Sequence, residues 1–109
     1  TWAGGLAEAL WRLMALRARG IHHYRDAGEA SWHQFAQAIA EEAVALGLLQ
    51  SMPDVVPIAT GEYPAAACRP GYSVLDDRET RMLLGLEAVD WRANLRRVLH
   101  DMQRAGGSA

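Results

Sequence analysis

The sequence contains no lysine, because all eleven of its Lys and Arg positions are arginine. Without lysine the chain cannot form a Schiff base through a side-chain amine, and it cannot supply the lysine of a Walker phosphate-binding loop. It also cannot provide the lysine of a Tyr-x-x-x-Lys oxidoreductase pair. These kinds of site are therefore excluded for this chain taken alone.

Several other features are scarce. The single cysteine, Cys68, cannot form an internal disulfide. No apolar run approaches the roughly 18 residues of a membrane span, and the first residues lack the basic region and apolar core of a signal peptide. The net charge of -2 creates no positive field for nucleic acid or anionic lipid. We therefore expect a cytoplasmic protein with no nucleic-acid or membrane partner. We also expect the sequence to begin within a longer protein.

The composition that remains is globular. The chain has 109 residues, of which 50% are hydrophobic and 22% charged, so it can bury one core without a disulfide or a metal. We predict one domain over residues 1–105 and a flexible tail over residues 106–109.

Four segments have the apolar spacing of helices. They are residues 6–19, 31–46, 76–84 and 90–102. Ser31 and Gln34 form a capping box at the start of the second segment. Gly20, Gly47 and Gly85 are placed to end the first three.

Two short segments, residues 21–24 and 55–59, have the composition of strands, and Pro57 makes the second an edge strand. Two strands of this length do not hold a sheet alone, so we expect them to extend a sheet or a domain that the chain lacks. The predicted fold class is α/β, a small, helix-rich mixed domain with about four helices and two or three short strands.

Residues 60–74 form a long segment without periodicity, and such loops are more often functional than idle. In this loop Arg69 precedes Pro70, and its guanidinium suits a phosphate or a carboxylate. The alternative is a structural arginine that ties the loop to helix carbonyls or to a buried aspartate. Tyr63 and Tyr72 can pack against a base or a sugar, whereas Trp32 is expected to pack in the core or at a hinge.

Metal and nucleophile sites have weak support. His22 and His23 would point to opposite faces of a strand, so they do not favour one shared ion. Cys68 has no signature of a neighbouring base, which favours a packing residue over a nucleophile. We predict neither a metal site nor a catalytic residue in this chain.

Five segments together resemble, in order, the C-terminal half of the dTDP-4-dehydrorhamnose reductase family within the extended short-chain dehydrogenases. They are residues 20–23, 31–39, 56–60, 62–76 and 91–95. The run Tyr-Pro-x-x-Ala-x-Arg-Pro-x-x-Ser-x-Leu, which covers residues 63–75, is the most specific of them. The similarity extends over nearly the whole chain.

The resemblance implies a two-part enzyme. An N-terminal Rossmann half binds NADPH or NADH and carries the catalytic pair, while the C-terminal half helps to hold the nucleotide sugar. The reaction implied is reduction of the 4-keto group of dTDP-4-dehydro-L-rhamnose to give dTDP-L-rhamnose for surface polysaccharide. This chain is then expected to lack the Rossmann half, to bind no cofactor and to be inactive alone, with Arg69, Tyr72 and Tyr63 as substrate-binding residues.

The expected partners are the chain's own N-terminal half and a dTDP-sugar. A homodimer with a second copy of the chain is left open. The same pattern occurs in a non-catalytic relative, the regulatory β subunit of methionine adenosyltransferase. A binding or regulatory module without turnover is therefore the alternative function. A small independent interaction domain is a third possible function.

Overall fold

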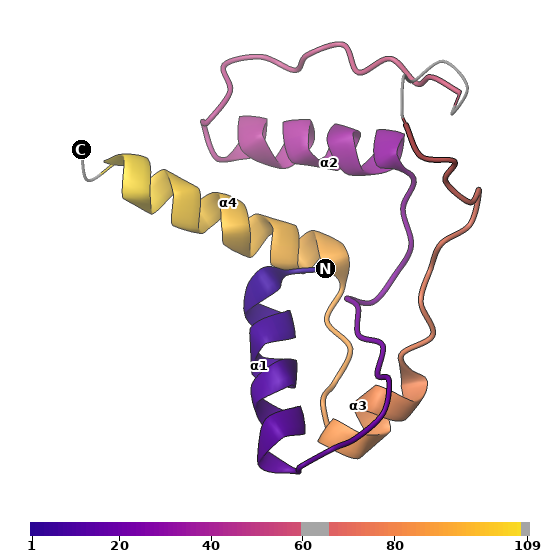
Figure 1. The fold of residues 1–109 in the computed structure, drawn as a ribbon. Coiled ribbons are helices and arrows are strands. Elements are labelled where there is room, and N and C mark those ends of the chain that lie inside the picture. The colour runs from indigo at the N-terminus through magenta and orange to yellow at the C-terminus, as the bar shows by residue number, and fades with distance from the viewer. Residues whose placement is uncertain (60–65, 108–109) are drawn as a thin grey trace. The chain divides into compact units, whose positions relative to one another are not determined.

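The computed structural model describes residues 1–59 and 66–107, and these contain four α-helices (Figure 1). The helices are α1 (Ala3–Ala15), α2 (Trp32–Ala45), α3 (Arg78–Leu84) and α4 (Trp91–Gly107). All four predicted helices are thus confirmed, with changed bounds. No helix in the described ranges combines the length and the apolar character needed to cross a membrane.

The chain divides into two compact units. Unit 1 consists of Thr1–Glu29 and Val74–Val98, and unit 2 consists of Ala30–Ser73 and Leu99–Ala109. Unit 1 therefore contains α1, α3 and the first half of α4, while unit 2 contains α2 and the second half of α4. Each unit is described by itself below.

The predicted strands are not confirmed. Residues 21–24 and 55–59 are irregular, and the described residues hold only one isolated parallel bridge, between Ala27 and Asp90. Ile21 in the first segment is 88% exposed. A strand needs a neighbour for its ladder of hydrogen bonds, and neither segment has one in the described structure. The described residues are therefore helical rather than α/β.

α1 ends at Ala15, four residues before its predicted end, because the chain turns at Arg17. Arg17 has a left-handed backbone with φ 53°. Two hydrogen bonds of 3.0 Å close a Schellman turn, from Arg17 N to Met14 O and from Ala18 N to Leu13 O. A left-handed arginine is uncommon, so the sequence pattern placed the stop at Gly20 instead.

α2 begins and ends as its local sequence predicts. The Ser31 Oγ accepts a hydrogen bond from Gln34 N at 3.1 Å, and the Gln34 Oε1 accepts one from Ser31 N at 2.8 Å. At the other end Gly47 has φ 77°, and the amide of Leu48 donates to Ala43 O at 2.8 Å. The capping box and the glycine stop are both confirmed.

Loss of the α2 cap is expected to weaken unit 2. Ser31→Ala removes the acceptor for the Gln34 amide, which costs about 1 kcal/mol. The midpoint of thermal unfolding, followed by circular dichroism, should fall by roughly 4–8 °C. Ser51→Ala, at an exposed serine of the same unit, is the matched control. Equal midpoints for the two variants would show that the capping box does not stabilise α2.

α3 and α4 are each preceded by acidic residues. α3 begins at Arg78, two residues after the predicted start, and the Asp76 Oδ1 accepts from Arg78 N at 3.2 Å. The Asp90 Oδ2 accepts from Arg92 N at 3.0 Å in the first turn of α4. α4 continues through Gly107, into the residues predicted as a tail. Residues 108–109 lie outside the described ranges, so the flexible tail stays a prediction.

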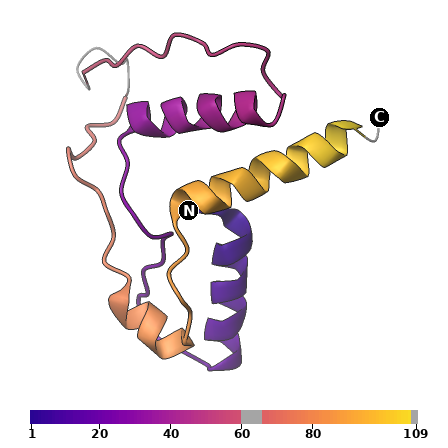
Figure 2. The same ribbon diagram turned by 180° about the vertical axis from the view of Figure 1, so that it is seen from behind.

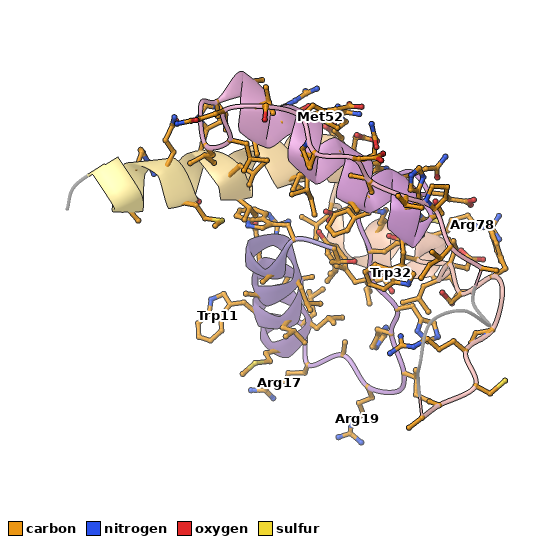
Figure 3. All side chains as sticks on the ribbon, turned by 90° about the horizontal axis from the view of Figure 1, so that it is seen from above. Trp11, Arg17, Arg19, Trp32, Met52 and Arg78 are labelled. Atoms are coloured by element: carbon orange, nitrogen blue, oxygen red, sulfur yellow. The ribbon has the colours of Figure 1, made fainter. Side chains whose placement is uncertain are left out.

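The packing of unit 1 differs from the apolar stripe predicted for α1. α1 contacts α3, and Ala9 (1% exposed) and Leu84 (6% exposed) are buried in this unit. Leu10, Trp11 and Met14 are more than half exposed, and Trp11 projects away from the helix (Figure 3). α1 thus buries the side that carries Ala9, while much of its predicted apolar face is exposed to solvent.

Candidate functional site

The segment that carries the predicted substrate residues lies at the surface of unit 2. Arg69 and Cys68 are exposed, and Tyr72 is 69% exposed. Tyr63 lies outside the described residues, and its place in the site stays a prediction. The exposure of Cys68 excludes the packing function predicted for it.

Trp32, in the same unit, was predicted to pack in the core or at a hinge, and the core position is wrong. Its side chain is 77% exposed, with one edge-to-face contact to Phe35 at 6.3 Å between ring centroids. The first residue of a capped helix can point outward as readily as inward, and the exposure of Trp32 shows that it points outward. Among its described residues, unit 2 therefore exposes the aromatic side chains of Trp32 and Tyr72, and Arg69 is exposed as well.

The chain that leaves this segment enters unit 1, where Arg25 holds it. The Arg25 Nε donates to Leu75 O at 2.6 Å. The Nη1 of the same guanidinium donates to Gly28 O at 2.8 Å and to Asp26 O at 3.1 Å. One side chain thereby joins the residues just before α3 to the extended segment that follows α1.

A second arginine holds the same part of the chain through a buried ion pair. The Arg81 Nε lies 2.6 Å from the Asp77 Oδ2, and these side chains are 13% and 8% exposed. The Asp77 Oδ2 has no hydrogen bond to a described residue, so the contact is electrostatic rather than well aligned. The Arg81 Nη1 donates to Glu87 O at 3.0 Å, and its Nη2 donates to Arg25 O.

Tyr24 completes this cluster in unit 1. The Arg81 guanidinium lies over its ring, 5.4 Å from the centroid. Burial raises the pKa of the Tyr24 hydroxyl, while the Arg81 cation opposes that rise. Tyr24 therefore stays neutral at physiological pH, and its ring serves as a packing surface for the cation rather than as a base. Figures 1 and 2 show the segment after α1 passing beside α3, where these contacts form.

The core of unit 1 is unusually polar. Its buried polar residues are Asp26, Asp77, Thr80 and Asn94, each no more than 6% exposed. Asp26 accepts a hydrogen bond from Trp2 N at 3.0 Å, and the Arg97 guanidinium lies 4.4 Å from the centre of the Trp2 ring. Asp26 binds the backbone and Asp77 pairs with Arg81, which makes these two carboxylates part of the scaffold.

At the surface, Asp76 and Arg78 form a bidentate pair. The Arg78 Nε donates to Asp76 Oδ1 at 2.9 Å, and its Nη2 donates to Asp76 Oδ2 at 2.7 Å. The side-chain and backbone hydrogen bonds from Arg78 lower the pKa of Asp76 to about 2. Asp76 is therefore an anion at every physiological pH and cannot act as an acid.

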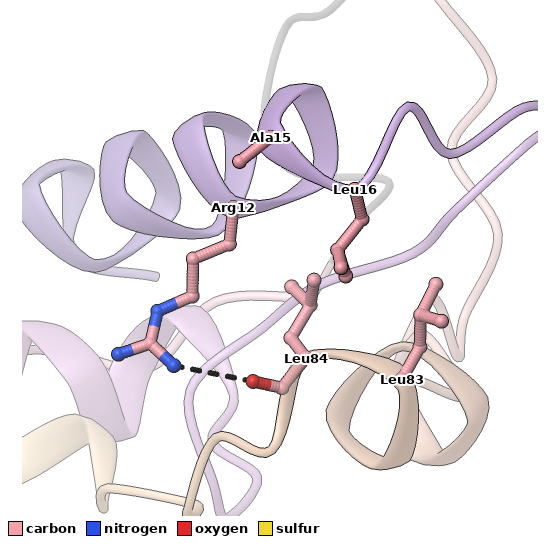
Figure 4. A pocket seen from close by; sticks show the side chains of 5 residues that line it. All are labelled: Arg12, Ala15, Leu16, Leu83 and Leu84. Carbon is pink, nitrogen blue, oxygen red and sulfur yellow. Dashed lines mark hydrogen bonds between the residues drawn. The ribbon is translucent and has the colours of Figure 1, made fainter.

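Unit 1 has a shallow hollow of about 380 Å³ between α1 and α3 (Figure 4). It is lined by Arg12, Ala15, Leu16, Leu83 and Leu84. The Arg12 Nη1 donates to Leu84 O at 3.1 Å, and its Nη2 pairs with Glu8 at 2.9 Å. Since the only charge in the lining is already paired, this apolar hollow does not suit an anionic ligand, and it contains none of the predicted site residues.

The sequence pattern missed Arg25 and Arg81. Asp77 and Arg81 are spaced i, i+4 with the acid first, a local signal of a helical ion pair that was available. Arg25 had no such signal, because its partner Leu75 is 50 residues away.

These two arginines hold carbonyls of the connecting segments, and Arg81 also pairs with a buried aspartate, which is close to the structural function considered as the alternative for Arg69. Arg69 itself has no hydrogen bond or ion pair to any residue in the described ranges. In the same ranges, no three His, Cys, Asp or Glu side chains are grouped to hold a metal ion.

Comparison with known proteins agrees with the family resemblance of the sequence. The family model described as the RmlD substrate binding domain matches residues 1–104. A dTDP-4-dehydrorhamnose reductase of Burkholderia thailandensis is 39% identical, covering 84% of this chain and 35% of the relative. One from Aggregatibacter actinomycetemcomitans is 38% identical, and the match covers 72% of this chain and 27% of the relative. The Bacillus subtilis spore coat polysaccharide biosynthesis protein SpsK is 35% identical, and the match covers 96% of this chain and 34% of the relative.

The chain thus spans about a third of the length of the curated relatives it matches. No solved structure matches it significantly.

Proposed function

The chain belongs to the RmlD substrate-binding domain family, and from this membership we propose that it is the substrate-binding part of a dTDP-4-dehydrorhamnose reductase. The observation that carries the proposal is coverage, because the family match includes residues 1–104 of 109. In the proposed reaction the 4-keto group of dTDP-4-dehydro-L-rhamnose is reduced to the alcohol, and a nicotinamide bound by another part of the protein would supply the hydride. The product is dTDP-L-rhamnose.

The residues of this chain do not fit a nicotinamide site. It has no Gly-x-Gly-x-x-Gly loop for the pyrophosphate and no lysine for the catalytic pair. We assign the cofactor, NADPH or NADH, to an N-terminal Rossmann half, for which the greater length of the relatives leaves room. A homodimer is compatible with this assignment and is not required by it.

Within this division, the function of this chain is to hold the nucleotide sugar. Arg69 contacts a phosphate or hydroxyl oxygen, and Tyr72 and Tyr63 pack against the sugar or the base. Two observations support Arg69: the residue is exposed, and it has no hydrogen bond or ion pair to another residue of the described ranges. An exposed guanidinium can form the bidentate, charge-assisted contacts that phosphates favour.

A chimera tests the proposal. This chain replaces the matching third of the Burkholderia thailandensis relative, and oxidation of NADPH is followed with dTDP-4-dehydro-L-rhamnose. We expect turnover by the chimera and none by the 109-residue chain alone. A folded chimera that binds dTDP without turnover would favour the regulatory module instead. Preference for another dTDP-keto-sugar would favour the kind of reaction named for the Streptomyces antibioticus relative, a probable 4-ketoreductase that is 34% identical.

A further inference from the structure

We propose that Arg25 is a positioning residue for the substrate segment, defined here as residues 66–73. Arg25 does not contact the substrate; it fixes the point at which the segment ends and the chain enters unit 1. This inference rests on the proposed function, because a positioning effect on substrate binding requires the segment to bind substrate.

The first observation is the geometry around Leu75, two residues after the segment. The short 2.6 Å hydrogen bond from Arg25 Nε to Leu75 O is charge-assisted, which makes it stronger than a contact between neutral groups. The guanidinium is itself held in place, since its Nη1 donates to Gly28 O and Asp26 O. Leu75 is thus tied to a residue whose own side chain has little freedom.

The second observation is that the next anchor is connected to the first. Asp77 pairs with Arg81, and the Nη2 of Arg81 donates to the carbonyl of Arg25. Leu75 is therefore bound to the extended segment of unit 1 directly, and Asp77 is linked to the same segment through Arg81. A change at Arg25 frees one end of the stretch from Leu75 to Asp77 and leaves the other in place.

The third observation separates positioning from binding. The Nε and Nη1 atoms of Arg25 already donate to three carbonyl oxygens of the protein. A bidentate phosphate contact at this guanidinium would need Nε or Nη1, and it would therefore have to displace at least one of those bonds. Arg69 has no such bonds to described residues, so the two arginines have different tasks, one to hold the chain and the other to hold the ligand.

The test uses the active chimera with Arg25→Gln. We expect KM for the nucleotide sugar to rise about tenfold, because small displacements of binding groups weaken binding strongly, while kcat and KM for NADPH stay within about twofold. Arg25→Lys can donate to Leu75 O but cannot bridge it to Gly28 O, so partial rescue is expected. Arg12→Gln is the matched control, because Arg12 also donates to a carbonyl, Leu84 O, at the opposite end of α3.

A second measurement does not depend on activity. Amide hydrogen exchange of the 109-residue chain should become faster over residues 66–76 in Arg25→Gln and stay unchanged there in Arg12→Gln. A chimera without turnover, with no change at Arg25, would refute the proposed function. The hydrogen-exchange comparison would then decide alone whether Arg25 anchors residues 66–76. An active chimera whose KM and exchange are both unaffected by Arg25→Gln would overturn the positioning inference and leave the proposed function intact.

Discussion

Replacement of Arg81 by methionine is expected to destabilise unit 1 by about 3–5 kcal/mol. The change leaves the Asp77 carboxylate, 8% exposed, without the cation that lies 2.6 Å from it, and an uncompensated buried charge is costly. It also removes the hydrogen bonds to Glu87 O and Arg25 O. The midpoint of thermal unfolding should fall by on the order of 10 °C or more.

A neighbouring pair provides the control. Arg78→Met breaks the Asp76–Arg78 pair, whose side chains are 63% and 86% exposed, and surface pairs contribute about 0–1 kcal/mol. The double change Arg81→Met with Asp77→Asn removes both buried charges and should recover part of the loss. Equal unfolding midpoints for Arg81→Met and Arg78→Met would show that burial of the Asp77–Arg81 pair has no energetic consequence.

The largest effect on activity is expected from Arg69. In the chimera, Arg69→Ala should raise KM for the nucleotide sugar by roughly 10- to 100-fold, as expected when a charge-assisted contact to an anion is lost. KM for NADPH should not change, because the nicotinamide is assigned to the other half of the protein. Steady-state kinetics with each substrate varied in turn separates the two constants.

Arg104→Ala is the control for Arg69→Ala, since Arg104 is also exposed in unit 2 and pairs with Asp101 at 3.0 Å. It should lower stability slightly and leave both KM values unchanged. A well-folded Arg69→Ala chimera with an unchanged KM for the sugar would exclude Arg69 from the substrate site.

The helices were predictable because their signals are local. The capping box at Ser31 and the stop at Gly47 depend on residues three to five positions apart, so their sequence pattern fixes their geometry. The end of α1 was not predictable in this way, because Arg17 takes a backbone conformation that glycine usually supplies. The two predicted strands were not confirmed for a different reason. Composition favours an extended chain, but a sheet needs a partner strand, which no local pattern reveals.

The candidate site was predictable only in part. The motif identified the family, since the order of residues in the chain carries that information, while the substrate residues stay a prediction. It did not reveal that Arg25 binds Leu75 O, because this contact joins residues that are 50 positions apart. It also did not show that Trp32 is exposed, because a position at the start of a helix leaves the direction of the side chain open.

The division of the chain also constrains how the protein can be made and cut. Each unit is discontinuous in sequence: unit 1 needs both Thr1–Glu29 and Val74–Val98, and unit 2 needs both Ala30–Ser73 and Leu99–Ala109. During synthesis, α1 therefore leaves the ribosome long before Arg81 and Leu84 exist to pack with it. Neither unit can be expressed as one continuous fragment, and truncation after Ser73 removes the partners of α1 from unit 1. Subcloning of a smaller binding module would require a circular permutation or a new linker.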